Sequence, residues 1–319
     1  MSKEQRAKID AMLRQPRGES PESVEAFRAE FRAIMARRIV PDGLRTTETT
    51  LGDRPALQIE PGPGPNLSPS PSPSPSPGTI LYFHGGVWVL GSPETALSLA
   101  GNLAVRTGFR VFSLDYRLAP EHPFPAAIED ALSAYRALLD SGQDPSTIVF
   151  AGDSAGGGLA VTTSLAARDA GLPLPAAIVG FSSVFDVTWT GESMDTKAGI
   201  DPIFTRESLA QTAAMYLAGA DPHLPLLSPA LHADLTGLPP LLLQAGTNEI
   251  LLDDSTRMAA RAHAAGVDVI LDITADVPHV FQGFAGVLDE ADQALDRTAL
   301  FLTQHVHVHV PDTAAASAR

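Results

Sequence analysis

A strand, a tight turn and a helix are predicted to meet at one glycine-rich segment of this 319-residue chain. The apolar run from Ile148 to Ala151 is typical of a buried strand. It leads into Gly152-Asp153-Ser154-Ala155-Gly156, a G-x-S-x-G pentapeptide, and then into helix-forming residues 159–168. Glycines on both sides of Ser154 lack the Cβ atoms that would keep strand and helix apart. The segment therefore predicts a turn that presents the Ser154 hydroxyl as a nucleophile at the end of a strand.

Strands and helices alternate on both sides of this turn. The predicted strands cover residues 79–84, 110–115, 147–151, 176–182, 240–246 and 268–274, and the predicted helices cover 94–107, 124–141, 155–170, 252–265 and 286–303. Such alternation predicts an α/β fold with a mainly parallel sheet and helices on both faces. Residues 45–60 alternate around a Gly-Asp turn and predict an antiparallel strand pair, which makes an eight-stranded sheet.

Two further regions fall outside this alternation. Residues 3–15 and 22–38 predict helices, and the second has an apolar stripe at helical spacing that we expect to pack against the rest of the protein. Residues 186–226 contain helix-like pieces between two predicted strands. An insertion at the carboxyl ends of parallel strands is well placed to cover a site there.

Residues 61–78 are rich in proline, with a strict Ser-Pro repeat. Every second residue of that repeat lacks an N–H, so the segment cannot pair in a sheet. We expect an exposed loop insertion, and a docking site for a proline-reading module is the alternative.

Charge and composition exclude several classes of function. The formal net charge of −15 argues against nucleic acid or an anionic membrane as partner. The chain has no cysteine, which excludes disulfides and thiolate catalysis. Residues 1–17 lack the apolar region of a secretory signal, and no run approaches the roughly 20 apolar residues of a membrane span. We expect a soluble, cytoplasmic protein.

A serine nucleophile needs a base, and the base needs an orienting acid. His279 lies between a predicted strand and the next helix, whereas His263 falls within a predicted helix and His223 and His232 lie in the insertion. His279 is therefore the predicted base.

The predicted acid follows the strand at 240–246. Glu249 is the first carboxylate after that strand and lies in the turn, where it can reach an imidazole. Asp253 or Asp254 more naturally begins or caps the next helix. Glu249 is the predicted acid, with Asp253 as the alternative.

Negative charge on a reacting carbonyl oxygen needs backbone N–H donors. One is expected from Ala155 at the start of the helix after Ser154, and others from the loop of Gly85, Gly86 and Val87 after an early strand. His84 begins this loop, and we expect it to hold the loop by hydrogen bonding.

Together these segments resemble the hormone-sensitive-lipase-type branch (bacterial family IV) of the α/β-hydrolases. Within that branch the sequence is similar to the bacterial short-chain esterases and the related epsilon-lactone hydrolases. The matching segments are His84-Gly85-Gly86, residues 115–126 (DYRLAPEHPFPA), residues 152–157, residues 249–253 and Pro278-His279-Val280. The resemblance implies an α/β-hydrolase fold with a helical cap, and serine ester hydrolysis with no cofactor and no metal. Two residues depart from the family's pattern: Val87 replaces a usual third glycine, and Glu249 replaces the commoner aspartate.

The resemblance implies cap helices in residues 1–45 and an α/β-hydrolase domain in 46–306, with 186–226 as cap insertion and 307–319 as a flexible tail. The expected function is hydrolysis of short-chain, neutral carboxylic esters through an acyl-enzyme. A lactone hydrolase with the same triad and a non-catalytic ligand-binding homologue are the alternatives. The expected partner is a small-molecule ester or lactone, and a sheet-edge homodimer would fit the family. The residues expected to shape the substrate site are Phe27, Phe31, Trp88, Asp153, Met215, Tyr216, Val280 and Phe281.

Three histidines near the carboxyl end alternate with valines, namely His305, His307 and His309. In an extended chain their imidazoles would share one face and could chelate a metal. No carboxylate-rich partner accompanies them, so a flexible tail is the preferred interpretation.

Overall fold

The computed structural model describes residues 3–16, 22–62 and 76–306. Residues 63–75 of the proline-rich loop and the expected tail at 307–319 lie outside this range, as do His307 and His309. His305 is the last residue of a helix, where its Nδ1 bonds the Phe301 carbonyl at 2.8 Å. The alternative of an extended strip of three imidazoles is therefore wrong for its first member, and His305 is not part of a flexible tail either.

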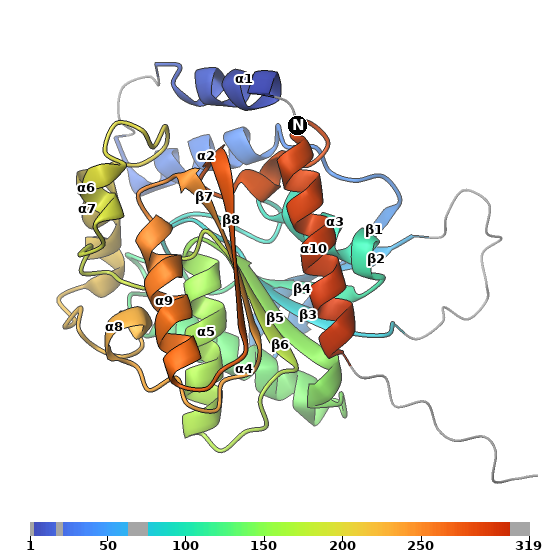
Figure 1. The fold of residues 1–319 in the computed structure, drawn as a ribbon. Helices are drawn as coiled ribbons and strands as arrows, with labels where there is room; N and C mark the ends of the chain where they lie inside the picture. The colour runs from blue at the N-terminus through green and yellow to red at the C-terminus, as the bar shows by residue number, and fades with distance from the viewer. Residues whose placement is uncertain (1–2, 17–21, 63–75, 307–319) are drawn as a thin grey trace, which may run out of the picture.

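One eight-stranded sheet forms the centre of the protein (Figure 1). The strands lie in the order β1-β2-β4-β3-β5-β6-β7-β8. The hairpin β1–β2 and the pair β2–β4 are antiparallel, and all other neighbours are parallel. The predicted mainly parallel sheet is confirmed. The strands are β1 (Leu44–Leu51), β2 (Arg54–Pro61), β3 (Thr79–Phe83), β4 (Arg110–Leu114), β5 (Ile148–Asp153), β6 (Ala177–Phe181), β7 (Leu241–Asn248) and β8 (Val269–Pro278).

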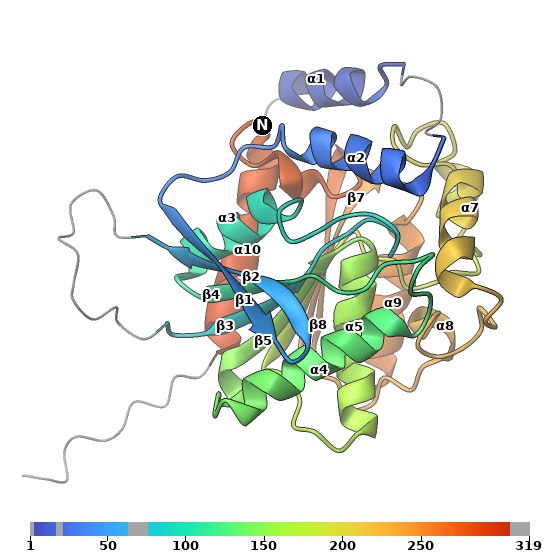
Figure 2. The same ribbon diagram turned by 180° about the vertical axis from the view of Figure 1, so that it is seen from behind.

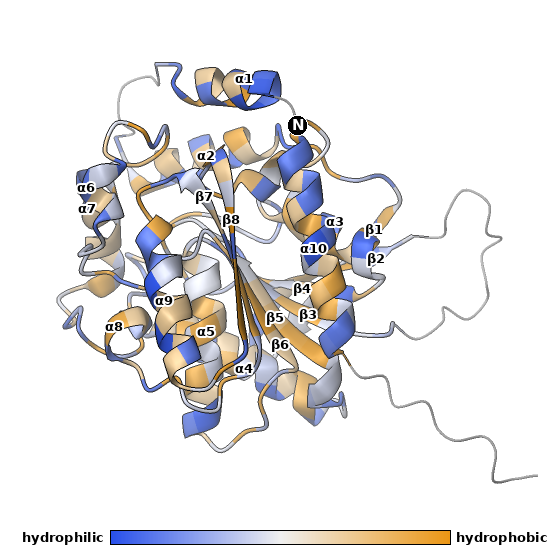
Figure 3. Cartoon of the chain, viewed as in Figure 1, coloured by the Kyte–Doolittle hydropathy of each residue, from blue (hydrophilic) through white to orange (hydrophobic). Residues whose placement is uncertain are grey.

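Helices cover both faces of the sheet (Figures 1 and 2). Alternating strand side chains feed two apolar cores, as Leu81 and Phe83 of β3 pack in one and Ile80 and Tyr82 in the other. Figure 3 shows the central strands as largely apolar, whereas the surrounding helices carry hydrophilic residues as well. One face is covered by α3 (Leu97–Thr107) and α10 (Asp289–His305), the other by α4 (Ala126–Asp140), α5 (Ala155–Asp169) and α9 (Leu252–Ala264).

Of the five remaining α-helices in the described residues, four come from the regions expected to form a cap, and the fifth, Pro229–His232, follows the second of these regions. They are α1 (Lys3–Leu13), α2 (Val24–Met35), α6 (Ser193–Thr196), α7 (Arg206–Leu217) and α8 (Pro229–His232), and two short 3-10 turns lie at η1 (Pro145–Thr147) and η2 (Phe281–Phe284). Ser23 caps α2 by accepting a hydrogen bond from the Ala26 N–H. Within the described residues, no helix is long and apolar enough to cross a lipid bilayer.

The apolar stripe of α2 packs in part against the core, as predicted, through Val24, Phe27 and Phe31, and it also faces a cavity. None of its residues is fully buried, and Ile34 is 39% exposed. Phe27, Phe31, Ile34 and Met35 line a cavity that also contains Ser154. The helix therefore forms a wall of the site and not only a packing element.

Candidate active site

Ser154 occupies a strained turn between β5 and α5. Its φ of 54° and ψ of −121° lie where residues with a Cβ rarely sit. A Cβ on Gly156 would lie 2.0 Å from the Phe83 carbonyl oxygen, and one on Gly152 would lie 2.4 Å from the Gly156 backbone. Both glycines are thus required by the close approach of strand and helix, as the sequence predicts.

His279 and Glu249 form a buried hydrogen-bonded pair. The imidazole Nδ1 lies 2.6 Å from Glu249 Oε2, and the Glu249 side chain is fully buried. Glu249 Oε1 accepts hydrogen bonds from the Gly246 N–H at 2.6 Å and from the Ser182 hydroxyl at 3.0 Å. Because the carboxylate accepts at Nδ1, the tautomer with a free Nε2 is favoured.

Ser182 was missed by the sequence analysis, although it supports this pair. Its hydroxyl donates to Glu249 and accepts the Val280 N–H at 2.9 Å, so it ties the acid to the residue after His279. Ser182 follows β6, which lies between β5 and β7 in the sheet. That position, at the end of a strand between the nucleophile's strand and the acid's strand, is the signal that could have identified it.

Ser154 and His279 face the same cavity. In the described part of the chain no hydrogen bond joins the Ser154 hydroxyl to the imidazole, and an edge of the Phe204 ring lies against the imidazole with centroids 5.0 Å apart. Hydrogen bonds between catalytic groups are often long in a free enzyme and tighten when substrate binds. A substrate bound in this cavity can therefore contact both the Ser154 hydroxyl and the His279 imidazole.

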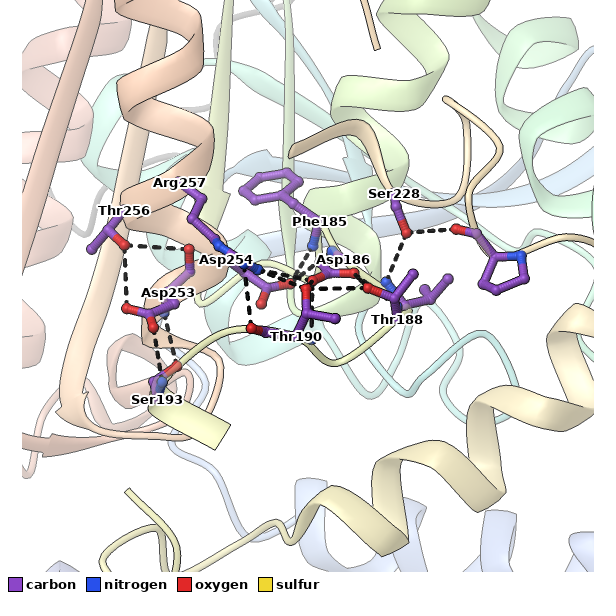
Figure 4. A network of polar contacts seen from close by, with 12 residues as sticks. Phe185, Asp186, Thr188, Thr190, Ser193, Ser228, Asp253, Asp254, Thr256 and Arg257 are labelled. Carbon is purple, nitrogen blue, oxygen red and sulfur yellow. Dashed lines mark hydrogen bonds and ion pairs between the residues drawn. The ribbon is translucent and has the colours of Figure 1, made fainter. Parts of the chain in front are cut away.

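Among the described residues, neither Asp253 nor Asp254 has a hydrogen bond or ion pair with His279; Figure 4 shows the partners that they have instead. Asp253 Oδ2 accepts the Ser193 N–H at 2.8 Å. Asp254 Oδ2 accepts the N–H groups of Phe185 and Asp186 at 2.6 and 2.9 Å. Both lie in the first turn of α9, as expected, but neither caps it, since α9 has no side-chain cap. Both carboxylates bind the segment after β6, and helix propensity alone does not predict such contacts.

Asp186 anchors the beginning of the insertion at 186–226 (Figure 4). Burial alone would raise the pKa of its carboxyl, but hydrogen bonds from Thr188 and Thr190 lower it overall. The guanidinium of Arg257 on α9 pairs with Asp186 at 3.0 Å. The insertion is thereby fixed to the helix that follows the acid's strand.

Three of the four expected oxyanion donors are available. The N–H of Gly85 instead interacts with the Asp153 carboxylate and lowers its pKa. Within the described residues, the N–H groups of Gly86, Val87 and Ala155 have no acceptor. Gly86 and Val87 have φ values of 121° and 53°, so the loop turns sharply where its N–H groups are free.

Asp153 joins the two loops that meet at Ser154. Its Oδ1 accepts the Tyr82 hydroxyl at 2.7 Å. Burial raises the pKa of Asp153, and the hydrogen bonds from Tyr82 and Gly85 oppose that rise. A Cβ on Gly85 would lie 2.3 Å from Asp153 Oδ2, so only glycine permits this approach.

His84 holds the oxyanion loop, as the sequence analysis expects. Its Nδ1 donates to the Gly85 carbonyl at 2.8 Å, and its ring stacks on Tyr116 with centroids 4.2 Å apart. The Tyr116 hydroxyl donates to the His84 carbonyl at 2.7 Å. Burial lowers the pKa of His84 to about 4, so the ring is neutral at physiological pH.

A cavity of about 240 Å³ leads to Ser154. Of the residues expected to line it, Phe27, Phe31, Asp153 and Val280 do so. Four others do not. Trp88 and Tyr216 stack on each other at 4.5 Å within the core, Met215 is 36% exposed, and Phe281 is buried against α1 and α10. The wall residues missed from sequence include Met35, Arg38, Leu90, Ile203, Phe204 and Thr212.

No group of three or more histidine, aspartate or glutamate side chains in the described ranges is arranged to hold a metal ion. The candidate site contains the serine, the imidazole–carboxylate pair and backbone N–H groups.

Comparison with known proteins finds esterases among the relatives of this chain. The family with the alpha/beta hydrolase fold matches residues 80–283. An acetyl-hydrolase of Streptomyces hygroscopicus is 45% identical over 70% of this chain and 75% of its own length. An esterase of Acinetobacter venetianus is 40% identical over 70% of this chain and 74% of its own. A crystal structure of an esterase from the bacterial hormone-sensitive lipase family, 41% identical, superimposes with a TM-score of 0.87 and covers 96% of this chain and 100% of that one.

Proposed function

Because this chain belongs to the α/β-hydrolase family, among the bacterial hormone-sensitive-lipase-type carboxylic ester hydrolases, we propose that Ser154, His279 and Glu249 form its catalytic triad. The observation that carries the proposal is the 2.6 Å contact between His279 Nδ1 and Glu249 Oε2, on an imidazole that faces the same cavity as Ser154. A nucleophile, a base and an orienting acid are the parts that acyl transfer requires.

In the proposed reaction Ser154 Oγ attacks the ester carbonyl while His279 Nε2 takes the hydroxyl proton. Glu249 stabilises the imidazolium that forms, and the N–H groups of Gly86, Val87 and Ala155 stabilise the oxyanion. The imidazolium then gives its proton to the departing alkoxide, which leaves as the alcohol, and an acyl-enzyme remains. Water, deprotonated by His279, attacks the acyl-enzyme and releases the carboxylic acid.

The cavity supports a small substrate. Its volume of about 240 Å³ lies below the range of roughly 300–1,000 Å³ that is common for sites of drug-sized ligands. Its walls near the triad are largely apolar, with Phe31, Val87 and Phe204 among them. We therefore propose short-chain esters whose acyl group is neutral and apolar where it meets the triad.

The testing experiment is hydrolysis of p-nitrophenyl esters from acetate to dodecanoate, with the wild type and with Ser154→Ala. We expect the highest kcat/KM at short chains, and turnover by the folded Ser154→Ala variant lower by roughly a millionfold. A folded Ser154→Ala variant with substantial activity would reject Ser154 as the nucleophile.

A seven-membered lactone is assayed beside the esters, because the same triad could open a ring. Slow lactone opening supports the carboxylesterase. Lactone opening faster than ester hydrolysis would assign the protein to the lactone hydrolases instead.

A further inference from the structure

The charged groups along the active-site cavity differ in how they are neutralised. His279 is paired with Glu249, and Asp153 accepts hydrogen bonds from Tyr82 and Gly85. Arg38 lines the same cavity, partly buried, and no carboxylate in the described residues pairs with its guanidinium. A cation withdrawn from water without a counter-charge is unfavourable, so its persistence in this wall needs an explanation.

Several other arginines have carboxylate partners, whereas Arg261 is satisfied by the Pro229 and Ala233 carbonyls. Arg28 pairs with Glu121 at 2.7 Å, Arg117 with Asp130 at 2.7 Å, and Arg257 with Asp186 at 3.0 Å. The guanidinium of Arg38 instead lies 3.5 Å above the centroid of the Phe284 ring. Stacking on an aromatic face compensates part of the lost hydration but leaves the edge N–H groups available to a ligand.

Arg38 keeps its charge in this position. Burial lowers the pKa of its guanidinium to about 10, which leaves the side chain protonated at neutral pH. Glu30 on α2 also lines the cavity, but among the described residues no ion pair joins it to Arg38. Glu30 is exposed to solvent and does not neutralise the guanidinium.

Hydrogen bonds to the end of α2 and to α3 hold the backbone around Arg38. The Arg38 N–H bonds the Met35 carbonyl at the end of α2. The Ser98 hydroxyl of α3 donates to the Ile39 carbonyl at 2.5 Å. The residues at the start of α3 that line the cavity, namely its N-cap Ala96 with Ser98 and Leu99, are neutral. These bonds hold the backbone that carries the Arg38 guanidinium, and the α3 side of the cavity offers no negative charge.

We propose that Arg38 binds a carboxylate carried by the substrate, at the end remote from the ester bond. A guanidinium presents paired N–H donors that match the two oxygens of a carboxylate. The preferred substrates would then be short half-esters of dicarboxylic acids, or short acyl esters of hydroxy acids. This inference rests on the proposed function and refines it, since the substrate is neutral at the triad and anionic at its far end.

The experiment compares matched substrates in the wild type and in Arg38→Met. The acyl-side pair is the mono-p-nitrophenyl ester of glutaric acid against p-nitrophenyl valerate, and the alcohol-side pair is acetylated hydroxybutyrate against butyl acetate. The readout is the ratio of kcat/KM for the anionic over the neutral member. In at least one pair we expect the wild type to favour the anionic substrate and Arg38→Met to lower the ratio by roughly ten- to hundredfold, mainly through KM.

Two further variants control the measurement. Arg37→Met removes the neighbouring exposed arginine, which does not line the cavity, and should leave the ratio unchanged. Arg38→Lys keeps the charge without the planar fork and should give an intermediate ratio. Thermal unfolding of each variant checks that the fold is retained. If Arg38→Met does not fold, the Arg38→Lys ratio and the loss of preference at high salt decide the question.

Failure of this inference is distinguishable from failure of the proposed function. Equal ratios in the wild type and Arg38→Met, with Ser154-dependent hydrolysis of the neutral esters intact, would overturn the role of Arg38 alone. Loss of Ser154 dependence with the neutral esters would instead reject the triad on which the inference rests.

Discussion

Glu249 and Asp254 are buried carboxylates five positions apart, yet their partners give them different chemistry. Glu249 accepts from an imidazole, a hydroxyl and a backbone N–H, so one of its partners can become a cation during turnover. Asp254 accepts only from the N–H groups of Phe185 and Asp186. Burial raises the pKa of Asp254 well above its usual value. One carboxylate is suited to orient a base, and the other to hold a loop.

We predict that Glu249→Gln lowers kcat with p-nitrophenyl butyrate by about a thousandfold or more. The amide cannot stabilise an imidazolium and can favour the wrong tautomer of His279. Asp253→Asn is the control, because Asp253 bonds the Ser193 N–H and not the imidazole. Its kcat should stay within about threefold of the wild type. Steady-state kinetics of both variants make the comparison, and the reverse ranking would move the acid to Asp253.

The site residues that could be predicted from sequence are those that directly follow the end of a strand. Ser154, Glu249 and His279 follow β5, β7 and β8, and parallel strands bring their carboxyl ends to one edge of the sheet. The observed β8 is longer than the predicted strand and ends at Pro278, which sets His279 directly at that edge.

The cavity wall was not predictable in the same way. Arg38 and Phe204 line it because two segments far apart in the chain fold over the sheet edge, and no local pattern fixes that docking. Trp88 and Tyr216 were wrongly assigned because aromatic composition does not say whether two rings face a ligand or each other. Contacts of long sequence separation decide those positions.

At the scale of elements, α9 holds the insertion through three side chains: Asp253, Asp254 and Arg257 (Figure 4). Both N–H groups that reach Asp254 end on one oxygen, Oδ2. Burial, followed by the nearby Asp186 charge, raises the Asp254 pKa, and Arg257 opposes that rise. The anchor therefore contains a carboxyl whose protonated form is favoured by folding.

We predict that Asp254→Asn increases stability at pH 8. A carboxyl whose folded pKa is raised stabilises the folded state fully only below its unfolded pKa of about 4, and that contribution is lost as pH rises toward the folded pKa. Asparagine does not ionise, and its carbonyl oxygen can accept both N–H groups. Urea unfolding at pH 5, 6.5 and 8 should show an advantage of the variant that grows with pH. An advantage independent of pH, or a variant less stable at pH 8, would contradict this account.

At the scale of the molecule, the two edges of the sheet differ in what they expose. The β1 edge is polar, with the sequence LRTTETTL, and such edges resist pairing with another chain. The β8 edge exposes Ile270 and Ile273, which are 52% and 42% accessible. Exposed isoleucines on an edge strand favour burial against a second copy.

We therefore predict a homodimer that pairs through β8, and Ile273→Lys should convert it to a monomer. A lysine at this position would place a positive charge in an apolar contact at the edge of each sheet. Sedimentation velocity at micromolar concentrations measures the outcome. Thr47→Lys, at an exposed position of β1, is the matched control and should remain dimeric. A monomeric wild type, or a dimer that Ile273→Lys leaves intact, would exclude the β8 edge as the interface. Because no residue of β8 lines the cavity in the described part of the chain, the monomeric variant should keep its hydrolysis of p-nitrophenyl butyrate.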